Sequence, residues 1–574
     1  MLGQIGERIL AGQMPHRDFD DPYTGGLGYL HALAFLAFGV HILSLRIVLF
    51  LAALAWIPAV FVVARRFVSP VTAALITASA VAWTMPNYFA SMPSYYNLFF
   101  ATWGTAALLR HVDTNSRIWL FIAGLCGGLS FLVKASGLYF VGAVIVFLLY
   151  REHLQHRGTE PRSLSVFVAK TVFGLIFVTG LAGLVAAHPG TSEFLHFFLP
   201  GTALVAVLLW TEWSDGRGPA GERIRGAALL VLPFLSGVLL PVTLFILPYV
   251  VTGSVSAWYE GVFVAPRSRF HSATAEMPPP VTMLAALPYG LVLVGGVARA
   301  RLLDRRWGMV VFAATAAIAL LAIAGGAVDP LYRSVWYSVR HLTLPIVLAG
   351  CFLLVSEHLG LSLPARQELY LLSLLAALMP LVQIPFAAAI YFCYAAPFLL
   401  LAAVAVVRHS STRYHWVHPA LLGGYLLFAV MWTNTNYVWT LGTSRVPYDF
   451  VGASMLPRAG IRMTAGDRTD YAKLVGLIQQ ANGSKRQIYA APDCPEVYFL
   501  SGTSNPTRTI YEFLRPAVNA DATLEVLERH RIDVVVINRS PGFSGPLDDS
   551  LAQALERKYP YYAEAGRFIV RWRL

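Results

Sequence analysis

The chain of 574 residues is poor in charge, in cysteine and, before residue 440, in lysine. Only 13% of its residues are charged and 57% are apolar, whereas soluble globular proteins carry roughly 25% charged residues. This composition excludes an ordinary soluble domain and an intrinsically disordered chain. The four cysteines, Cys126, Cys351, Cys393 and Cys494, lack the spacing of a disulfide framework or a zinc site. We therefore expect no structural metal.

Long apolar runs fill the first 440 residues instead. A helix needs about 20 apolar residues to cross a bilayer, where no water can satisfy an open backbone. Such runs predict about 14 spans, preceded by a shorter interfacial helix over 26–40. The spans are expected at 42–64, 71–88, 95–110, 117–134, 135–150, 165–187, 192–211, 226–250, 281–300, 307–326, 340–356, 367–383, 386–407 and 416–437. The stretches 117–150 and 367–407 can each be divided differently.

The basic residues divide unequally between the two sides of these spans. If Arg65 and Arg66 lie in the cytoplasm, 17 arginines before residue 440 fall on that side. Cytoplasmic loops are richer in Arg and Lys, so the bias predicts a multi-pass membrane protein in this orientation. It also makes the net charge of +12 a signal of topology, with no nucleic-acid partner. The opposite side receives seven basic residues: Arg8, Arg17, Lys134, Arg267, Arg269, Arg333 and Arg340.

Residues 438–574 have a different composition, with many charges and only short apolar runs. Helical and strand patterns alternate there, which predicts a small α/β domain. We expect helices at 469–481, 523–530 and 550–558, and strands at 487–491, 533–538 and 567–573. The predicted fold is thus mostly α, a polytopic bundle with an external, periplasmic α/β domain. Its expected domains are an external loop with an interfacial helix (1–41), a transmembrane domain (42–437) and the tail (438–574).

The densest polar cluster is the run from Gly12 to Tyr23, which has an arginine, a histidine and three carboxylates over 16–21. A carboxylate near a low-dielectric boundary can act as a general base or bind a metal. The three carboxylates of this cluster are therefore candidates for such a role, and Arg17 could bind a phosphate through two hydrogen bonds. The same Asp-Asp-Pro pattern is also typical of a solvated turn.

Two further candidates stand at expected external ends of spans. Lys134 is one of only two lysines before residue 440, and its point charge suits a lipid phosphate. Its alternative role is that of a snorkelling lysine at a short turn. Tyr88 opens a polar turn that could bind sugar hydroxyls, although most such turns only satisfy the backbone.

The long loop 253–280 and the turn before the span at 340–356 supply four more candidates. Arg269 and His271 lie in an aromatic and basic loop, which could cover a phosphorylated ligand or form an aromatic belt. Arg340 and His341 are costly to bury unpaired, so a phosphate or carboxylate partner is expected.

Three short runs resemble the GT-C fold glycosyltransferases, within the aminoarabinose-transferase and protein O-mannosyltransferase-like group. The first is Gly12-Gln-Met-Pro-His-Arg-Asp-Phe-Asp20, followed by an apolar helix and a span. The second is Leu132-Val-Lys-Ala-Ser-Gly137, and the third is Ala491-Pro-Asp-Cys-Pro-Glu-Val-Tyr-Phe-Leu-Ser-Gly502. The resemblance covers the order and sidedness of these runs along the whole chain, although each motif is short.

The resemblance implies transfer of a sugar from a polyprenyl-phosphate donor to a lipid, glycan or protein acceptor on the external face. The catalytic base would be Asp18, with Asp20 as second choice, and Lys134 and Arg340 would bind the carrier phosphate. A divalent metal is possible, since related oligosaccharyltransferases use one. The family normally has a span before the first loop, so we expect either that such a span precedes this sequence or that the short segment crosses unaided.

Two other functions compete with glycosyl transfer. A membrane transporter or lipid flippase is the alternative, but its charged or broken spans are not evident here. A membrane scaffold whose tail binds a partner is the third hypothesis, and it leaves the cluster of carboxylates without a role.

Overall fold

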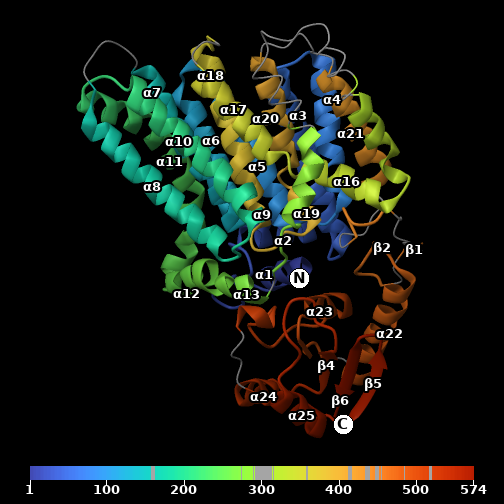
Figure 1. The fold of residues 1–574 in the computed structure, drawn as a ribbon. Helices are drawn as coiled ribbons and strands as arrows, with labels where there is room; N and C mark the ends of the chain where they lie inside the picture. The colour runs from blue at the N-terminus through green and yellow to red at the C-terminus, as the bar shows by residue number, and fades with distance from the viewer. Residues whose placement is uncertain are drawn as a thin grey trace.

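The computed structural model describes residues 1–573 except 157–161, 273, 289, 291–312, 314–315, 357–359, 411–416, 434–439, 446–451, 454–455, 484 and 516–519. The described chain is mostly helical, with a small sheet near its C-terminus (Figure 1). The predicted mostly α fold with a C-terminal α/β region is therefore confirmed. The proposed boundary at 437–438 lies outside the described residues.

Two helices precede the first long one. α1 (Leu2–Leu10) is followed by a loop and then by α2 (Gly26–Phe38), which agrees with the helix predicted at 26–40. α2 ends at Gly39, whose φ of 86° lies in the left-handed region that favours glycine. α1 packs against both α2 and the tail helix α23 (Pro495–Ser501), so the first residues connect the helical part to the tail.

The next helices form the first half of the helical part. α6 (Arg117–Val133) packs closely against α11 (Ala220–Val251), and three glycines allow this contact. A Cβ atom added to Gly124 or Gly128 of α6 would lie within 2.3 Å of a carbonyl oxygen of α11. A Cβ atom added to Gly237 of α11 would lie within 2.2 Å of a carbonyl oxygen of α6. Small residues permit such close contact between helices in membranes. The helices are α3 (Ile42–Arg65), α4 (Pro70–Ala82), α5 (Pro93–Thr114), α6 (Arg117–Val133), α7 (Leu138–Gln155), α8 (Leu164–Ala186), α9 (Thr191–Glu193), α10 (Leu199–Asp215) and α11 (Ala220–Val251).

The second half contains shorter helices and more turns. α18 (Leu363–Leu378) is buried from Ala365 to its last residue, and it packs against α7, α17 (Thr343–Val355) and α20 (Ala396–His409). The helices are α12 (Val255–Tyr259), α13 (Arg269–Ser272), α16 (Asp329–Arg340), α17 (Thr343–Val355), α18 (Leu363–Leu378), α19 (Ala389–Cys393), α20 (Ala396–His409) and α21 (Val417–Phe428).

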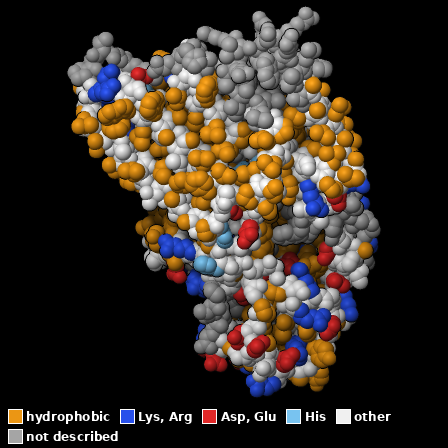
Figure 2. Space-filling view, viewed as in Figure 1, with side chains coloured by type: hydrophobic (Ala, Val, Ile, Leu, Met, Phe, Trp, Pro, Cys, Tyr) orange, Lys and Arg blue, Asp and Glu red, His pale blue; other side chains and the backbone are white. Residues whose placement is uncertain are grey.

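Seven helical stretches of the described chain are long and apolar enough to cross a membrane: Ile42–Arg65, Ala135–Gln155, Leu164–Ala186, Thr191–Asp215, Ala220–Val251, Asp329–Val355 and Leu363–Gln383. Other predicted spans coincide with helices under 18 residues, such as α6, α20 and α4, because turns interrupt the apolar run. The expected spans 281–300 and 307–326 lie partly outside the described residues. Figure 2 shows apolar side chains over the surface of the helical part, as in a membrane protein.

The tail is a small α/β unit with a four-stranded sheet of order β3-β4-β6-β5. β3 (Tyr489–Ala491) and β4 (Val534–Asn538) are parallel, and β6 (Phe568–Trp572) is antiparallel to both β4 and β5 (Tyr561–Ala565). All three predicted strands and all three predicted helices are present, the helices as α22 (Ala465–Asn482), α24 (Ala520–Arg529) and α25 (Asp549–Lys558). β5 was not predicted, because this edge strand is mostly exposed and lacks a clear apolar alternation. A two-stranded sheet, β1 (Gly452–Ala453) with β2 (Arg462–Met463), precedes α22.

The tail packs against one end of the helical part, the end at which α3 begins (Figure 1). Two backbone hydrogen bonds join them, from Asp20 N to Arg508 O at 2.9 Å and from Ile42 N to Arg458 O at 3.0 Å. α12 and α13 lie at the same end (Figure 1). The first loop, the 253–280 loop and the tail thus meet, although they are far apart in the sequence.

Candidate functional site

The predicted base Asp18 is the anchor of a tight turn in the first loop. Its carboxylate accepts hydrogen bonds from Met14 N at 2.7 Å and from Arg17 Nε and Nη2 at 2.9 and 2.7 Å. These bonds from Arg17 hold the pKa of Asp18 below its ordinary value. Asp18 is partly exposed, so it stays accessible, but its carboxylate and the guanidinium of Arg17 are already engaged with each other.

Asp20 is held by two arginines of the tail. Arg515 Nε donates to Asp20 Oδ2 at 2.9 Å, and Arg508 Nη2 lies 3.5 Å from Oδ1. Arg508 also donates to the carbonyl oxygen of His16 at 2.6 Å. The tail therefore positions the loop through Asp20, a link that the sequence did not predict.

Asp21, the third carboxylate of the cluster, has no cationic partner among the described residues. It is buried, and the bond that it receives is from Tyr23 N at 2.9 Å. Burial raises the pKa of Asp21 to about 7. A carboxyl that titrates near neutral pH is better matched to proton transfer than one of low pKa. The sequence analysis included Asp21 in the cluster but did not select it, because no local pattern distinguishes the buried carboxylate from its neighbours.

A cavity of about 360 Å³ lies where the first residues, the helical part and the tail meet. Its walls are mostly aromatic and apolar, and nine separate segments contribute to them. The lining residues are Met1, Leu2, Gly3, Pro22, Tyr23, Ile42, Leu45, Arg46, Tyr88, Ala90, Ser91, Met92, Arg269, Phe386, Ile390, Tyr391, Tyr394, Glu496, Phe499, Leu500, Tyr511, Phe513 and Phe543. Pro22 and Tyr23 directly follow Asp21, so the acidic loop borders this cavity.

Two arginines line the cavity, and no ion pair joins either of them to another described residue. Arg46 extends from the first turn of α3 and Arg269 from the first residue of α13. The Nε atoms of both are buried and have no hydrogen-bond partner among the described residues. Since an unpaired buried donor is costly, both guanidinium groups are suited to an anion that enters the cavity. Arg269 was predicted as a site residue, whereas Arg46 was counted only as part of a span. The signal for Arg46 was an arginine close to the start of an apolar helix.

Lys134 lies behind the aromatic wall of the cavity. It caps the C-terminus of α6, donates to Ser94 Oγ at 3.0 Å, and its Nζ is 5.1 Å from the ring centroid of Tyr391. Tyr391 lines the cavity, as does the predicted sugar-binding Tyr88. The structure thus brings together three predicted residues, Tyr88, Lys134 and Arg269, which the sequence could only place on the same side.

The other predicted residues lie apart from the cavity wall. Arg340 is buried and donates to Gln383 Oε1 at 3.2 Å and to the carbonyl oxygen of Ala387, so it braces the segment that carries the cavity residue Phe386. His341 Nε2 lies 2.9 Å from Thr282 Oγ1. His271 is exposed, two residues beyond Arg269.

The tail contributes a second carboxyl of high proton affinity. Glu512 lies between the cavity residues Tyr511 and Phe513, and its Oε2 accepts a hydrogen bond from Asp493 N at 2.7 Å. Burial raises the pKa of Glu512 to about 7. Within the described ranges, no group of three or more His, Cys, Asp or Glu side chains is arranged to hold a metal ion.

Comparison with known proteins adds no relative: no protein-family model matches the chain, and no curated protein is similar to it.

Proposed function

We propose that this chain is an integral-membrane glycosyltransferase, which moves a sugar from a polyprenyl-phosphate carrier to an acceptor at the tail end of the helical part. One observation carries the proposal. A cavity at the border between apolar helices and a polar tail contains two arginines, Arg46 and Arg269, whose Nε atoms have no partner among the described residues. The acceptor would be a lipid, a glycan or a protein.

The position of these arginines suits a lipid-linked phosphate. A polyprenyl chain stays in the bilayer, so its phosphate must lie near the headgroup plane, where basic residues at the ends of spans can reach it. Arg46 is in the first turn of the apolar helix α3, and Lys134 is at the end of α6. The positive charge would bind the donor and then stabilise the phosphate as the leaving group.

The carboxylates that border the cavity would supply the base. In an inverting displacement, the acceptor oxygen bonds to the anomeric carbon as the bond from that carbon to the phosphate oxygen breaks, and polyprenyl phosphate leaves. The acceptor proton passes to a carboxylate. Asp18 and Asp20 are the candidates from the sequence, and Asp21 is the best matched to this step because its pKa is raised to about 7. A divalent metal is an additional component that we leave open.

The proposed topology is about 14 spans in the bacterial inner membrane, with the tail in the periplasm. It is supported by the seven long apolar helices and by the excess of arginine at the end away from the tail. The cavity would then face the periplasm, where lipid-linked sugars are used to modify the cell envelope.

Sugar transfer in vitro from a panel of polyprenyl-phosphate sugars tests the proposal. We expect the wild type to release polyprenyl phosphate and Asp21→Asn to lose most of the turnover. Asp18→Asn and Asp20→Asn, measured in parallel, identify the base among the three. Arg267→Gln is the matched control for Arg269→Gln, because Arg267 is exposed in the same loop and does not line the cavity.

Three results would contradict the proposal. Full transfer by all three Asp→Asn variants while they remain folded would show that the loop provides no base. Movement of labelled lipid across sealed vesicles without loss of its sugar would favour the transporter or flippase. A folded protein that consumes no donor and moves no lipid would leave the scaffold hypothesis.

A further inference from the structure

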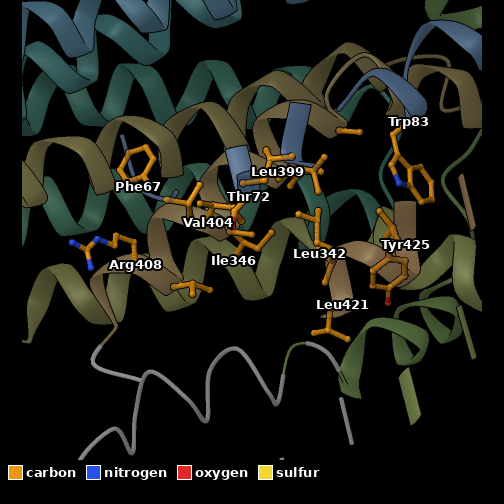
Figure 3. Close-up of a pocket in the computed structure, with 18 of the residues that line it drawn as sticks. Phe67, Thr72, Trp83, Leu342, Ile346, Leu399, Val404, Arg408, Leu421 and Tyr425 are labelled. Atoms are coloured by element: carbon orange, nitrogen blue, oxygen red, sulfur yellow. The ribbon is translucent and has the colours of Figure 1, made fainter. Parts of the chain in front are cut away.

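A second cavity lies among α4, α17, α20 and α21, away from the tail junction (Figure 3). Its volume is about 290 Å³, close to the lower end of the roughly 300–1,000 Å³ range of ligand pockets. The wall is almost entirely aliphatic and aromatic. It includes Ile76, Leu342, Ile346, Leu399, Val404 and Leu421.

The two ends of this cavity differ in polarity and in exposure. Trp83 and Tyr425, drawn at one end in Figure 3, are buried, so that end is closed. Arg408 and Phe67 are drawn at the other end, where the side chains of Arg408 and Ser69 are exposed. The cavity is therefore a blind apolar groove with a cationic mouth, which matches an amphiphile with one anionic end.

Arg408 is available for such a ligand. No ion pair or hydrogen bond joins its guanidinium to another described residue, whereas the neighbouring His409 is paired with Glu368. The hydroxyls of Ser69 and Thr72, which lie 3.0 Å apart, add two polar groups to the lining. An exposed arginine attracts anionic headgroups at a membrane surface.

The mouth of this groove opens at the end of the bundle away from the tail. Phe67 at the mouth follows the last residue of α3, whereas Arg46 in the tail-end cavity lies in the first turn of the same helix. Phe67 is 21 positions beyond Arg46, which at 1.5 Å per residue corresponds to about 30 Å, the thickness of a bilayer core. A phosphate at Arg408 would thus belong to the leaflet opposite that of the proposed sugar donor.

We propose that this groove binds one anionic phospholipid from the leaflet that faces away from the tail. One acyl chain fills the apolar groove towards Trp83, and the phosphate lies at Arg408. The site is distinct from the proposed transfer site, and its occupation does not depend on sugar transfer.

Native mass spectrometry of the full chain in detergent, after incubation with phosphatidylglycerol or phosphatidylcholine, tests this site. We expect one tightly retained phosphatidylglycerol and about five-fold weaker retention in Arg408→Gln, as for the loss of one basic residue near a lipid surface. Val404→Trp should fill the groove and abolish retention of this lipid. Arg117→Gln and Leu175→Trp are the matched controls, because both residues are exposed on helices outside the groove.

The outcomes separate the possible occupants. Unchanged phosphatidylglycerol retention in both Arg408→Gln and Val404→Trp would overturn the site. Equal retention of phosphatidylcholine would overturn the selection for an anionic headgroup. If added polyprenyl phosphate is lost in Val404→Trp but kept in Arg408→Gln, the groove holds the chain of the donor, and the proposed phospholipid is wrong.

Discussion

At the end of the helical part that faces away from the tail, four buried charges are paired with one another, whereas two arginines at the tail end, Arg46 and Arg269, have no ion pair among the described residues. Arg223 Nε lies 2.8 Å from Glu152 Oε1 and Arg223 Nη2 lies 2.8 Å from Glu212 Oε2, while Lys170 Nζ is 2.8 Å from Glu212 Oε2. These four residues come from α11, α7, α10 and α8, which the network joins. Arg46 at the tail end has no such partner among the described residues.

This difference distinguishes charges that stabilise the fold from charges that are suited to bind a ligand. A buried ion network is tolerated because each charge is neutralised where it is desolvated. A desolvated charge without a partner raises the free energy of the empty site and lowers it again when a counter-ion binds. The two ends therefore respond differently to substitution, and three measurements test this contrast.

The largest effect is expected in the paired network. Arg223→Gln removes a shared cation from Glu152 and Glu212, which keep Lys170 and their contacts with His156 and His153, respectively. We expect a loss of about 3–5 kcal/mol in the free energy of unfolding. Reversible denaturation in mixed micelles measures it. Arg225→Gln is the control, since Arg225 is exposed on the same helix. A loss of under about 0.5 kcal/mol, typical of surface substitutions, would contradict a stabilising role for the network.

A smaller effect on a different property is expected in the cavity. Arg46→Gln or Arg269→Gln should leave the unliganded protein at least as stable as the wild type. Each should weaken polyprenyl-phosphate binding about 10- to 100-fold, since a hydrogen bond to a charged group contributes about 1.5–3 kcal/mol. The shift in melting temperature on adding this lipid measures the affinity, with Arg267→Gln as control. Destabilisation of the empty protein without weaker binding would instead assign both arginines to the fold.

The smallest effect is a dependence of stability on pH. The pKa of Asp21 is raised by burial from its ordinary value of 3.8 to about 7, so the folded protein binds a proton that the unfolded chain releases. This contribution to stability is complete below about pH 4 and is lost as the pH rises to 7, at about 1.4 kcal/mol per unit. Glu512 titrates in the same window, so the difference between wild type and Asp21→Asn is the measured quantity. A difference that stays constant between pH 5 and 8 would refute the raised pKa.

The helical elements were largely predictable because their signals are local. A run of apolar residues long enough for a span can be recognised within a single window of the sequence, and α3, α6 and α8 were predicted within a few residues of their ends. The length of a span was less predictable where turns divide an apolar run. The stretch 386–407 became α19 and α20, separated by a turn, because the sequence does not show where the chain bends to bring Phe386 to the cavity.

The candidate site was predictable only as a set of residues on one side. The side assignment correctly grouped Arg17, Lys134 and Arg269 with the tail. It did not distinguish Asp21 from Asp18 and Asp20, since the three share one polar run and differ only in what surrounds them: Arg17 for Asp18, two tail arginines for Asp20 and none for Asp21.

By itself the sequence determined the composition and secondary structure of each region: an apolar helical part, a mixed α/β tail and an excess of arginine at one end. These properties follow from composition and periodicity, which are set by residues close together in the sequence. Tertiary structure alone decided which charges are neutralised, since the partners of Arg223 and Asp20 come from distant segments. It also brought Arg46 and Arg269 to one cavity, because desolvation and pairing depend on packing in space rather than on order along the chain.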